Sequence, residues 1–130
     1  MAPIPDSHAD IFRKPAFAHI ATVGTDGVPQ VTPVWIDYDG TYIRFNTARG
    51  RVKDRNLQAN PVIALSILDP DNAYRYVGVQ GTVVDDTEDG AVEHIHALSR
   101  AYTGRDYAHL RAGEVRVIYR ILPERVWTMG

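Results

Sequence analysis

The residues from Tyr42 to Pro61, YIRFNTARGRVKDRNLQANP, combine a cluster of cations with the kind of loop that binds anions. Asp54 is the only acid among them, and the cations are Arg44, Arg49, Arg51, Lys53 and Arg55. Residues 46–50 form a short loop with Asn, Thr and Gly that opens a predicted helix, so free backbone N–H groups lie at the positive end of its dipole. Cationic side chains beside such groups form a phosphate site. The alternative is a solvated basic helix face, as most charge runs are.

Hydrophobic periodicity predicts the elements that position this loop. A strand over 41–47 places Ile43 and Phe45 on one face, and the helix after the loop must end by Pro61. Asp-Gly pairs at 26–27 and 39–40 predict hairpin turns, which make the first three strands an antiparallel meander. The remaining predicted strands cover 17–23, 28–38, 62–68, 74–84 and 114–122, and the other helices cover 6–14 and 91–102. Pro123 is expected to interrupt the chain before a last short stretch, 126–128.

The strand over 28–38 contains two prolines, Pro29 and Pro33. Neither can donate a ladder hydrogen bond, so the strand is either an ordinary edge strand or one interrupted at these positions. An interrupted strand leaves N–H and C=O groups that a flat polar ring can engage. Both interpretations remain open from the sequence.

Two segments in the second half of the chain have distinct faces. In the strand over 74–84, Val77, Val79 and Val83 share the predicted core face, and Tyr74, Tyr76, Gln80 and Thr82 share the other. The helix over 91–102 follows several acids that complement its dipole, and its predicted buried stripe is Val92, Ile95, Leu98 or Ser99, and Tyr102. His94 and His96 point to nearly opposite sides of this helix, so no metal site is predicted.

Composition limits the class of protein. With 130 residues the chain is expected to be a single domain, 1–130, with one core. Its formal net charge of -2 argues against general nucleic-acid binding. It has no cysteine, no apolar run that could span a membrane and no signal-peptide core at its start, so a cytoplasmic protein without membrane attachment is expected.

No self-contained catalytic motif is present: the sequence lacks GxSxG, HExxH, Walker A and GxGxxG patterns. The five histidines are scattered, and His19 is predicted to be a core residue because it shares a strand face with Phe17 and Ala21. The predicted fold is mainly β (α+β), with six antiparallel strands, or seven, closing into a small barrel with flanking helices. An anion site on such a barrel indicates that a bound cofactor supplies the chemistry.

Several segments resemble the split β-barrel flavin and deazaflavin oxidoreductases, which include the pyridoxamine 5′-phosphate oxidases and relatives that use coenzyme F420. The segments are PQVTPVW (29–35), Asn46-Thr47, RVKDRNL (51–57) and Asn60-Pro61, and the likeness covers residues 8–128. The resemblance implies an FMN-binding-type split barrel and a homodimer with cofactor sites at the subunit interface.

The resemblance also implies site residues. The phosphate side of the cofactor would be held by Asn46, Thr47, Ala48, Arg51 and Lys53, with Asn56 in the same motif. The ring system would lie along Gln30, Val31, Thr32, Pro33 and Val34. Tyr74 and Tyr76 would reach the site from the other subunit, and both are candidates for the proton donor.

The resemblance leaves the cofactor open between coenzyme F420 and FMN. Pyridoxamine oxidases continue beyond an R-x-x-P-like segment, whereas this chain has little after Arg120-Ile121-Leu122-Pro123. The short length and the basic loop look more like the deazaflavin branch, whose cofactor carries a phosphate and an acidic polyglutamate tail. Arg49, Arg55 and Arg75 are candidates for attracting that tail, with solvated surface arginines as the alternative. We therefore expect hydride transfer between reduced F420 and an unsaturated small molecule, with an FMN enzyme and a non-catalytic cofactor-binding protein as alternatives.

Overall fold

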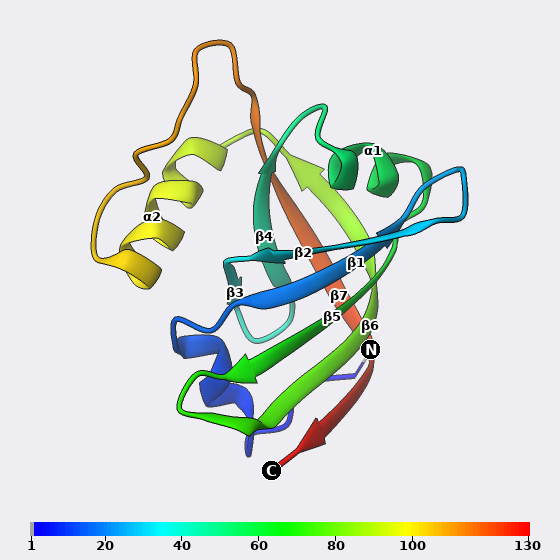
Figure 1. Ribbon diagram of the computed structural model, residues 1–130, viewed down its shortest axis with the longest axis vertical. Coiled ribbons are helices and arrows are strands. Elements are labelled where there is room, and N and C mark those ends of the chain that lie inside the picture. The colour runs from blue at the N-terminus through cyan, green and yellow to red at the C-terminus, as the bar shows by residue number, and fades with distance from the viewer. Residues whose placement is uncertain (1) are drawn as a thin grey trace.

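A computed structural model describes residues 2–130, in which seven strands form one antiparallel sheet in the order β2-β1-β5-β6-β7-β4-β3 (Figure 1). The strands are β1 (Ala18–Val23), β2 (Pro29–Val34), β3 (Ile36–Tyr38), β4 (Ile43–Ala48), β5 (Val62–Asp69), β6 (Asn72–Thr87) and β7 (Arg116–Met129). The helices are a 3₁₀ helix, η1 (Ala9–Arg13), and two α-helices, α1 (Val52–Ala59) and α2 (Ala91–Thr103). None of the helices described for residues 2–130 is long and apolar enough to cross a membrane.

The two edge strands of the sheet, β2 and β3, are separated in the chain only by Trp35. β2 pairs with β1, whereas β3 pairs with β4 at the opposite edge. The sheet therefore curls until its edges approach each other, which is the arrangement of a split barrel. Tyr102 of α2 joins the two sides, because its hydroxyl lies 2.6 Å from the carbonyl oxygen of Ala16 and also contacts the backbone of Ile36.

The mainly β, split-barrel prediction is confirmed, and the strand count within residues 2–130 is seven, the higher of the two numbers predicted. The extra strand arises because the predicted strand over 28–38 breaks at Trp35 and changes partners there, so the meander consists of two hairpins at opposite edges. The expected interruption at Pro123 is wrong. β7 continues through it because the pairing register shifts there: Gln80 pairs with Arg125 and Gly81 with Pro123, which leaves Glu124 as an extra residue of β7. A proline is tolerated at such a bulge.

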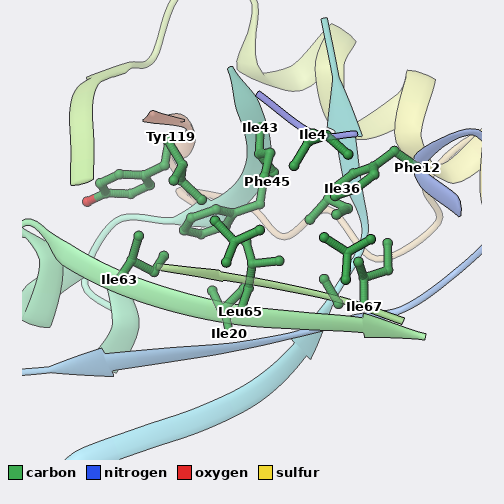
Figure 2. Packing of buried hydrophobic residues seen from close by; sticks show 14 of the residues in the cluster. Ile4, Phe12, Ile20, Ile36, Ile43, Phe45, Ile63, Leu65, Ile67 and Tyr119 are labelled. Atoms are coloured by element: carbon green, nitrogen blue, oxygen red, sulfur yellow. The ribbon is translucent and has the colours of Figure 1, made fainter. Parts of the chain in front are cut away.

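The core lies inside the curl of the sheet, where side chains from β1, β3, β4, β5 and β7 converge (Figure 2). Phe45 and Tyr119 stack with ring centroids 5.2 Å apart, and Ile43 is fully buried beside them. The prediction that His19 belongs to the core is wrong: Ala18 and Ile20 are buried and His19 is exposed. Alternation predicts two faces, but packing against other strands decides which one turns inward.

The helices differ from prediction in extent and in buried face. The segment over 6–14 forms only the 3₁₀ turn η1, whereas α2 extends to Thr103 and stops at Gly104, whose φ of 80° suits a glycine cap. In α2, Ile95 and Leu98 are buried as predicted, but Val92 is 44% exposed and His94 is buried instead. His94 is tolerated inside because both of its ring nitrogens have hydrogen-bond partners.

Candidate functional site

The turn between β4 and α1 is held by the acid within the basic stretch. Asp54 is buried, and its carboxylate accepts hydrogen bonds from the Gly50 N–H (2.9 Å), from Arg49 (3.1 Å) and from the Tyr119 hydroxyl. Gly50 itself adopts a φ of 90°. Burial opposes the ionisation of Asp54, but these hydrogen bonds keep its pKa below the ordinary value. The start of α1, with Arg51 and Lys53, is thereby fixed relative to the barrel.

A pocket of about 270 Å³ lies between the start of α1, α2, the β2–β3 break and the start of β7. Its lining combines cationic, amide and apolar side chains: Phe17, Pro33, Val34, Trp35, Asn46, Arg51, Lys53, Ile95, Leu98, Tyr107 and Arg116. Five of the predicted cofactor-binding residues meet here, namely Pro33, Val34, Asn46, Arg51 and Lys53. The structure therefore brings together the two halves of the predicted site, the basic helix and the proline-containing strand.

Positive charge in this pocket exceeds the negative charge beside it. Lys53 is half-buried and has no acidic partner within residues 2–130. Among the same residues, Arg51 forms a single long ion pair, with its guanidinium 3.9 Å from a carboxylate oxygen of Glu114. Arg116 is buried and donates to Glu114 (2.7 Å). Burial, with Arg51 and Arg116 nearby, lowers the pKa of Lys53. A bound anion would relieve this repulsion.

The other walls of the pocket are apolar and include flat rings. Trp35 stacks on Tyr102 at 5.6 Å and meets the edge of Tyr107 at 6.1 Å, and Phe17 packs against Tyr102 as well. Ile95 and Leu98 of α2 complete the apolar lining. Such surfaces suit a planar, partly apolar ring attached to an anionic group.

Other residues that the resemblance assigns to the cofactor lie outside this pocket. Gln30, Val31 and Thr32 occupy earlier positions of β2, and Val31 is 60% exposed. Thr47 and Ala48 are buried at the end of β4 rather than in a loop.

Asn56 donates its amide hydrogen to Thr22 at 3.0 Å and ties α1 to β1. Gly24 permits this approach, because a Cβ there would lie 2.3 Å from the Asn56 amide oxygen. Within the chain, the Asn56 side chain therefore joins α1 to β1 and does not line the pocket.

Tyr74 and Tyr76 lie at the start of β6, in the hairpin with β5, and line no part of this pocket. Tyr74 is 83% exposed, and Tyr76 pairs with Met129 of β7. Within the chain, neither tyrosine therefore contributes to the cationic pocket.

Two arginines predicted to be available for an acidic tail are engaged in ion pairs. Arg49 contacts Asp54, Asp86 and Glu88, which raises its pKa further above the ordinary value. Arg75 binds Asp10 at 2.6 Å and Asp69 at 2.9 Å. Arg55 remains exposed, donates to the Gly50 carbonyl and forms no ion pair within residues 2–130. The expectation that Arg49 and Arg75 are available to an acidic tail is therefore wrong, because both already form ion pairs with acids of the same chain.

Several pocket residues were not predicted from the sequence. Arg116 and Tyr107 approach the basic helix from the far end of the chain, and the Arg116 guanidinium lies 5.4 Å from the Tyr107 ring centre. The signal available in the sequence for Arg116 was its place between Val115 and Val117 in an apolar strand. Tyr107 lies in an irregular segment, and no pattern there indicates a side-chain direction.

The helical histidines have separate partners. His94 contacts Asn46 and Asp37, whereas His96 accepts a hydrogen bond from the backbone N–H of Tyr107 at 3.0 Å. Within residues 2–130 no group of three or more potential metal ligands gathers.

Comparison with known proteins agrees with this architecture. A protein described as an F420 reductase matches with a TM-score of 0.86 and 35% identity, covering 95% of this chain and 98% of that one. The conserved hypothetical protein Rv2991 from Mycobacterium tuberculosis has a TM-score of 0.75 and 23% identity over 97% of this chain and 84% of its own. HupZ of Group A Streptococcus has a TM-score of 0.69 and 20% identity, over 96% and 93% of the two chains. The last two likenesses concern the fold alone.

None of the curated proteins matches the sequence. The family model of pyridoxamine 5′-phosphate oxidase matches residues 4–130, which is nearly the whole chain. On this match, and with a split barrel that carries a cationic, ring-walled pocket, the chain belongs to the pyridoxamine 5′-phosphate oxidase family.

Proposed function

We propose that this protein is a coenzyme F420-dependent oxidoreductase that transfers a hydride between the reduced cofactor and an unsaturated small molecule. The observation that carries the proposal is Lys53, a half-buried cation without an acidic partner in residues 2–130, beside Arg51 in a pocket with aromatic walls. Family membership and the 35% identity to a protein described as an F420 reductase support the same assignment.

The residues present fit a phosphorylated ring cofactor. Lys53 and Arg51 would hold the phosphate through charge-assisted hydrogen bonds, and Pro33, Val34 and Trp35 would lie along the ring. Three further side-chain oxygens close to these segments are buried without a hydrogen-bond partner: Gln30 Oε1, Thr32 Oγ1 and Thr47 Oγ1. Buried oxygens of this kind normally accept a hydrogen bond, so a ligand bound beside β2 and β4 would supply the missing donors.

Bound F420 supplies a ring carbon that carries or accepts the hydride. The chain contributes orientation and exclusion of water. Asp54 keeps the start of α1 rigid, so that Arg51 and Lys53 are held in place before a ligand arrives. The apolar side chains of Phe17, Ile95 and Leu98 keep one side of the pocket dry, which strengthens electrostatic contacts inside it.

Side-by-side absorbance titration of the purified protein with F420 and with FMN tests the proposal. We expect saturable binding of F420, tighter than that of FMN. Tighter binding of FMN would favour the second candidate, an FMN-dependent enzyme of the same family, which the family match also supports. Binding of F420 without turnover of any of a panel of activated alkenes would indicate a cofactor-binding protein.

We also propose that the protein acts as a homodimer in which Tyr74 and Tyr76 of one subunit approach the pocket of the other. Tyr74 is a large amphipathic side chain that is 83% exposed, and exposed tyrosines are enriched at interfaces. In that arrangement either tyrosine is positioned to donate the proton that accompanies hydride transfer. Sedimentation at micromolar concentration should show a dimer, and a monomer that binds cofactor normally would contradict the shared site.

A further inference from the structure

A continuous chain of side-chain hydrogen bonds runs from the pocket into the protein beneath α2. The Arg116 Nε donates to Asn46 Oδ1 at 2.8 Å. Asn46 Nδ2 lies 2.8 Å from the Ala91 carbonyl oxygen and 3.1 Å from His94 Nδ1. His94 Nε2 lies 2.9 Å from Asp37 Oδ2. Asn46, His94 and Arg116 are all buried, so each partner in this chain restricts the next.

The hydrogen positions in this chain follow from its two ends. An arginine Nε–H can only donate and a backbone carbonyl can only accept, so the Asn46 amide oxygen faces Arg116 and its NH₂ group faces Ala91 and His94. His94 Nδ1 must then accept from Asn46, and His94 Nε2 carries the hydrogen that it donates to Asp37. The ring is therefore the neutral Nε2–H tautomer.

Asp37 anchors the far end of the chain. It binds Arg44 through both carboxylate oxygens, at 2.8 and 2.9 Å, as well as His94. Although burial opposes its ionisation, the hydrogen bonds from His94 and Arg44 hold the pKa of Asp37 below its ordinary value. A fixed carboxylate at this end keeps the imidazole in one orientation.

Arg116, at the end of the hydrogen-bond chain that lies in the pocket, has N–H groups that are not used within the described part of the protein. Its Nε binds Asn46 and one Nη1 hydrogen binds Glu114 at 2.7 Å, while the other three N–H groups have no acceptor within residues 2–130. The guanidinium is buried and lines the pocket together with Arg51 and Lys53. A guanidinium held at its Nε in this way presents its remaining N–H groups in a fixed direction.

We propose that Arg116 is an anion-binding residue of this pocket and that His94 is its positioning residue, acting through Asn46. The inference rests on the anion-binding role of the pocket in the proposed function and adds to it a residue from β7. His94 holds the second hydrogen of the Asn46 amide, and the amide oxygen in turn holds Arg116 in the orientation that binds the anion.

The test compares four substitutions, using inorganic phosphate and F420 as separate probes. His94→Phe keeps a flat ring and removes both hydrogen bonds, and we expect phosphate to bind about three- to tenfold more weakly, the effect of one lost hydrogen bond. His94→Asn places an amide oxygen near the Nδ1 position and should restore most of the affinity. Arg116→Lys keeps the charge, loses the Nε contact with Asn46 and should weaken phosphate binding at least as much as His94→Phe.

His8→Phe is the matched control. His8 and His94 are each 6% exposed and hydrogen-bonded, but His8 contacts Ser7 and Met129 at the other end of the barrel. Its replacement should change stability and leave phosphate affinity unchanged. An effect on affinity equal to that of His94→Phe would mean that loss of stability explains both, and would overturn the positioning role.

Two further outcomes would overturn the proposal: a folded His94→Phe that binds phosphate like wild type, and phosphate that does not perturb the Arg116 side-chain signals of the wild-type protein. If His94→Phe does not fold, long-range ¹H–¹⁵N spectra of the wild type identify the tautomer of His94. The Nδ1–H tautomer or the imidazolium would contradict the hydrogen-bond chain and overturn the proposal. A protein that binds phosphate through Arg116 but does not bind F420 would contradict the proposed function and leave this inference standing.

Discussion

The half-buried ammonium group of Lys53 lies beside two other cations of the pocket, Arg51 and Arg116. It lies on the first turn of α1, its pKa is lowered by burial and by the neighbouring cations Arg51 and Arg116, and no carboxylate of residues 2–130 pairs with it. A lysine in this position costs stability unless a ligand compensates the charge. At the scale of the residue, Lys53 is therefore placed to gain from a bound anion.

Replacement of Lys53 tests this conclusion. Lys53→Met keeps most of the side-chain volume and removes the charge, so we expect cofactor affinity to fall by about one to two decades, equivalent to the loss of a charge-assisted hydrogen bond of about 1.5–3 kcal/mol. The free energy of unfolding of the ligand-free protein should stay the same or rise. Equilibrium titration and denaturant unfolding measure the two effects.

Arg125→Met, an exposed position on β7 outside the pocket, is the control for the change in net charge. It should leave affinity unchanged. Equal affinities for wild type and Lys53→Met would place the anion site elsewhere.

At the scale of the secondary-structure elements, clusters of ion pairs join neighbouring elements at both ends of the barrel. Arg49 joins the turn before α1 to the end of β6 through Asp86 and Glu88. At the opposite end, Asp69 of β5 binds Lys14 and Arg75 and ties the β5–β6 hairpin to η1. The Asp71 N–H, Lys14 and Arg75 lower the pKa of Asp69 to about 2. These ion pairs join the ends of the central strands β5 and β6 to the neighbouring helical segments.

The Asp69 cluster predicts how stability depends on acid. Because the pKa of Asp69 is about 2 when folded and 3.8 in its reference state, its stabilising effect is complete above about pH 4 and is lost as pH falls towards 2. Asp69→Asn should lower the denaturant midpoint at pH 7 and make the midpoint less dependent on pH between 4 and 2. Some pH dependence of the midpoint should remain in Asp69→Asn, because the pKa of Asp10 is also about 2.

Denaturant unfolding at several pH values measures this effect. Asp6→Asn, at an exposed position outside any ion pair within residues 2–130, is the control and should leave the midpoint nearly unchanged. An unaltered pH profile in Asp69→Asn would show that this carboxylate does not stabilise the hairpin.

For the whole molecule, the distribution of charge matters more than the net value of -2. The cations of the basic stretch divide into three groups: Arg44 and Arg49 are paired with acids, Arg51 and Lys53 line the pocket, and Arg55 is exposed. An acidic tail that leaves the pocket along α1 would therefore meet Arg55, and Arg49 is not free to contribute. The surface offers one exposed cation for this contact, Arg55, because the other two candidates from the sequence, Arg49 and Arg75, are engaged in ion pairs.

Salt dependence tests the contact with the tail. F420 affinity should decrease with ionic strength more steeply than FMN affinity, because exposed charges are screened and FMN lacks the carboxylates. Arg55→Ala should flatten the F420 curve and weaken binding at low salt by up to about fivefold, the upper range for an exposed pair. Titrations at several salt concentrations measure the slopes, with Arg125→Ala as control. Parallel slopes for the two cofactors would mean that Arg55 is only a solvated side chain.

Local patterns in the sequence predicted much of this protein. Alternation and turn residues predicted both hairpins, and the Asn-Pro pair at 60–61 predicted where α1 ends. Arg51 and Lys53 are also close in sequence, and because Arg51 is the extended N-cap residue of α1 and not a residue of the helix itself, both side chains line one pocket. The basic stretch belongs to one continuous segment, and short-range backbone geometry is sufficient to assemble it.

Only the tertiary structure decided which charges are free and which faces are buried. Arg49 binds Asp86 and Arg75 binds Asp10, which are 37 and 65 residues away in sequence. The hydroxyl of Tyr119 in β7 donates to the buried Asp54. Arg116 and Tyr107 complete a pocket that begins around residue 33. Strand alternation could not show that His19 faces outward, because a strand has the same period whichever side is buried. Pairing between distant strands sets these contacts, and no local pattern encodes it.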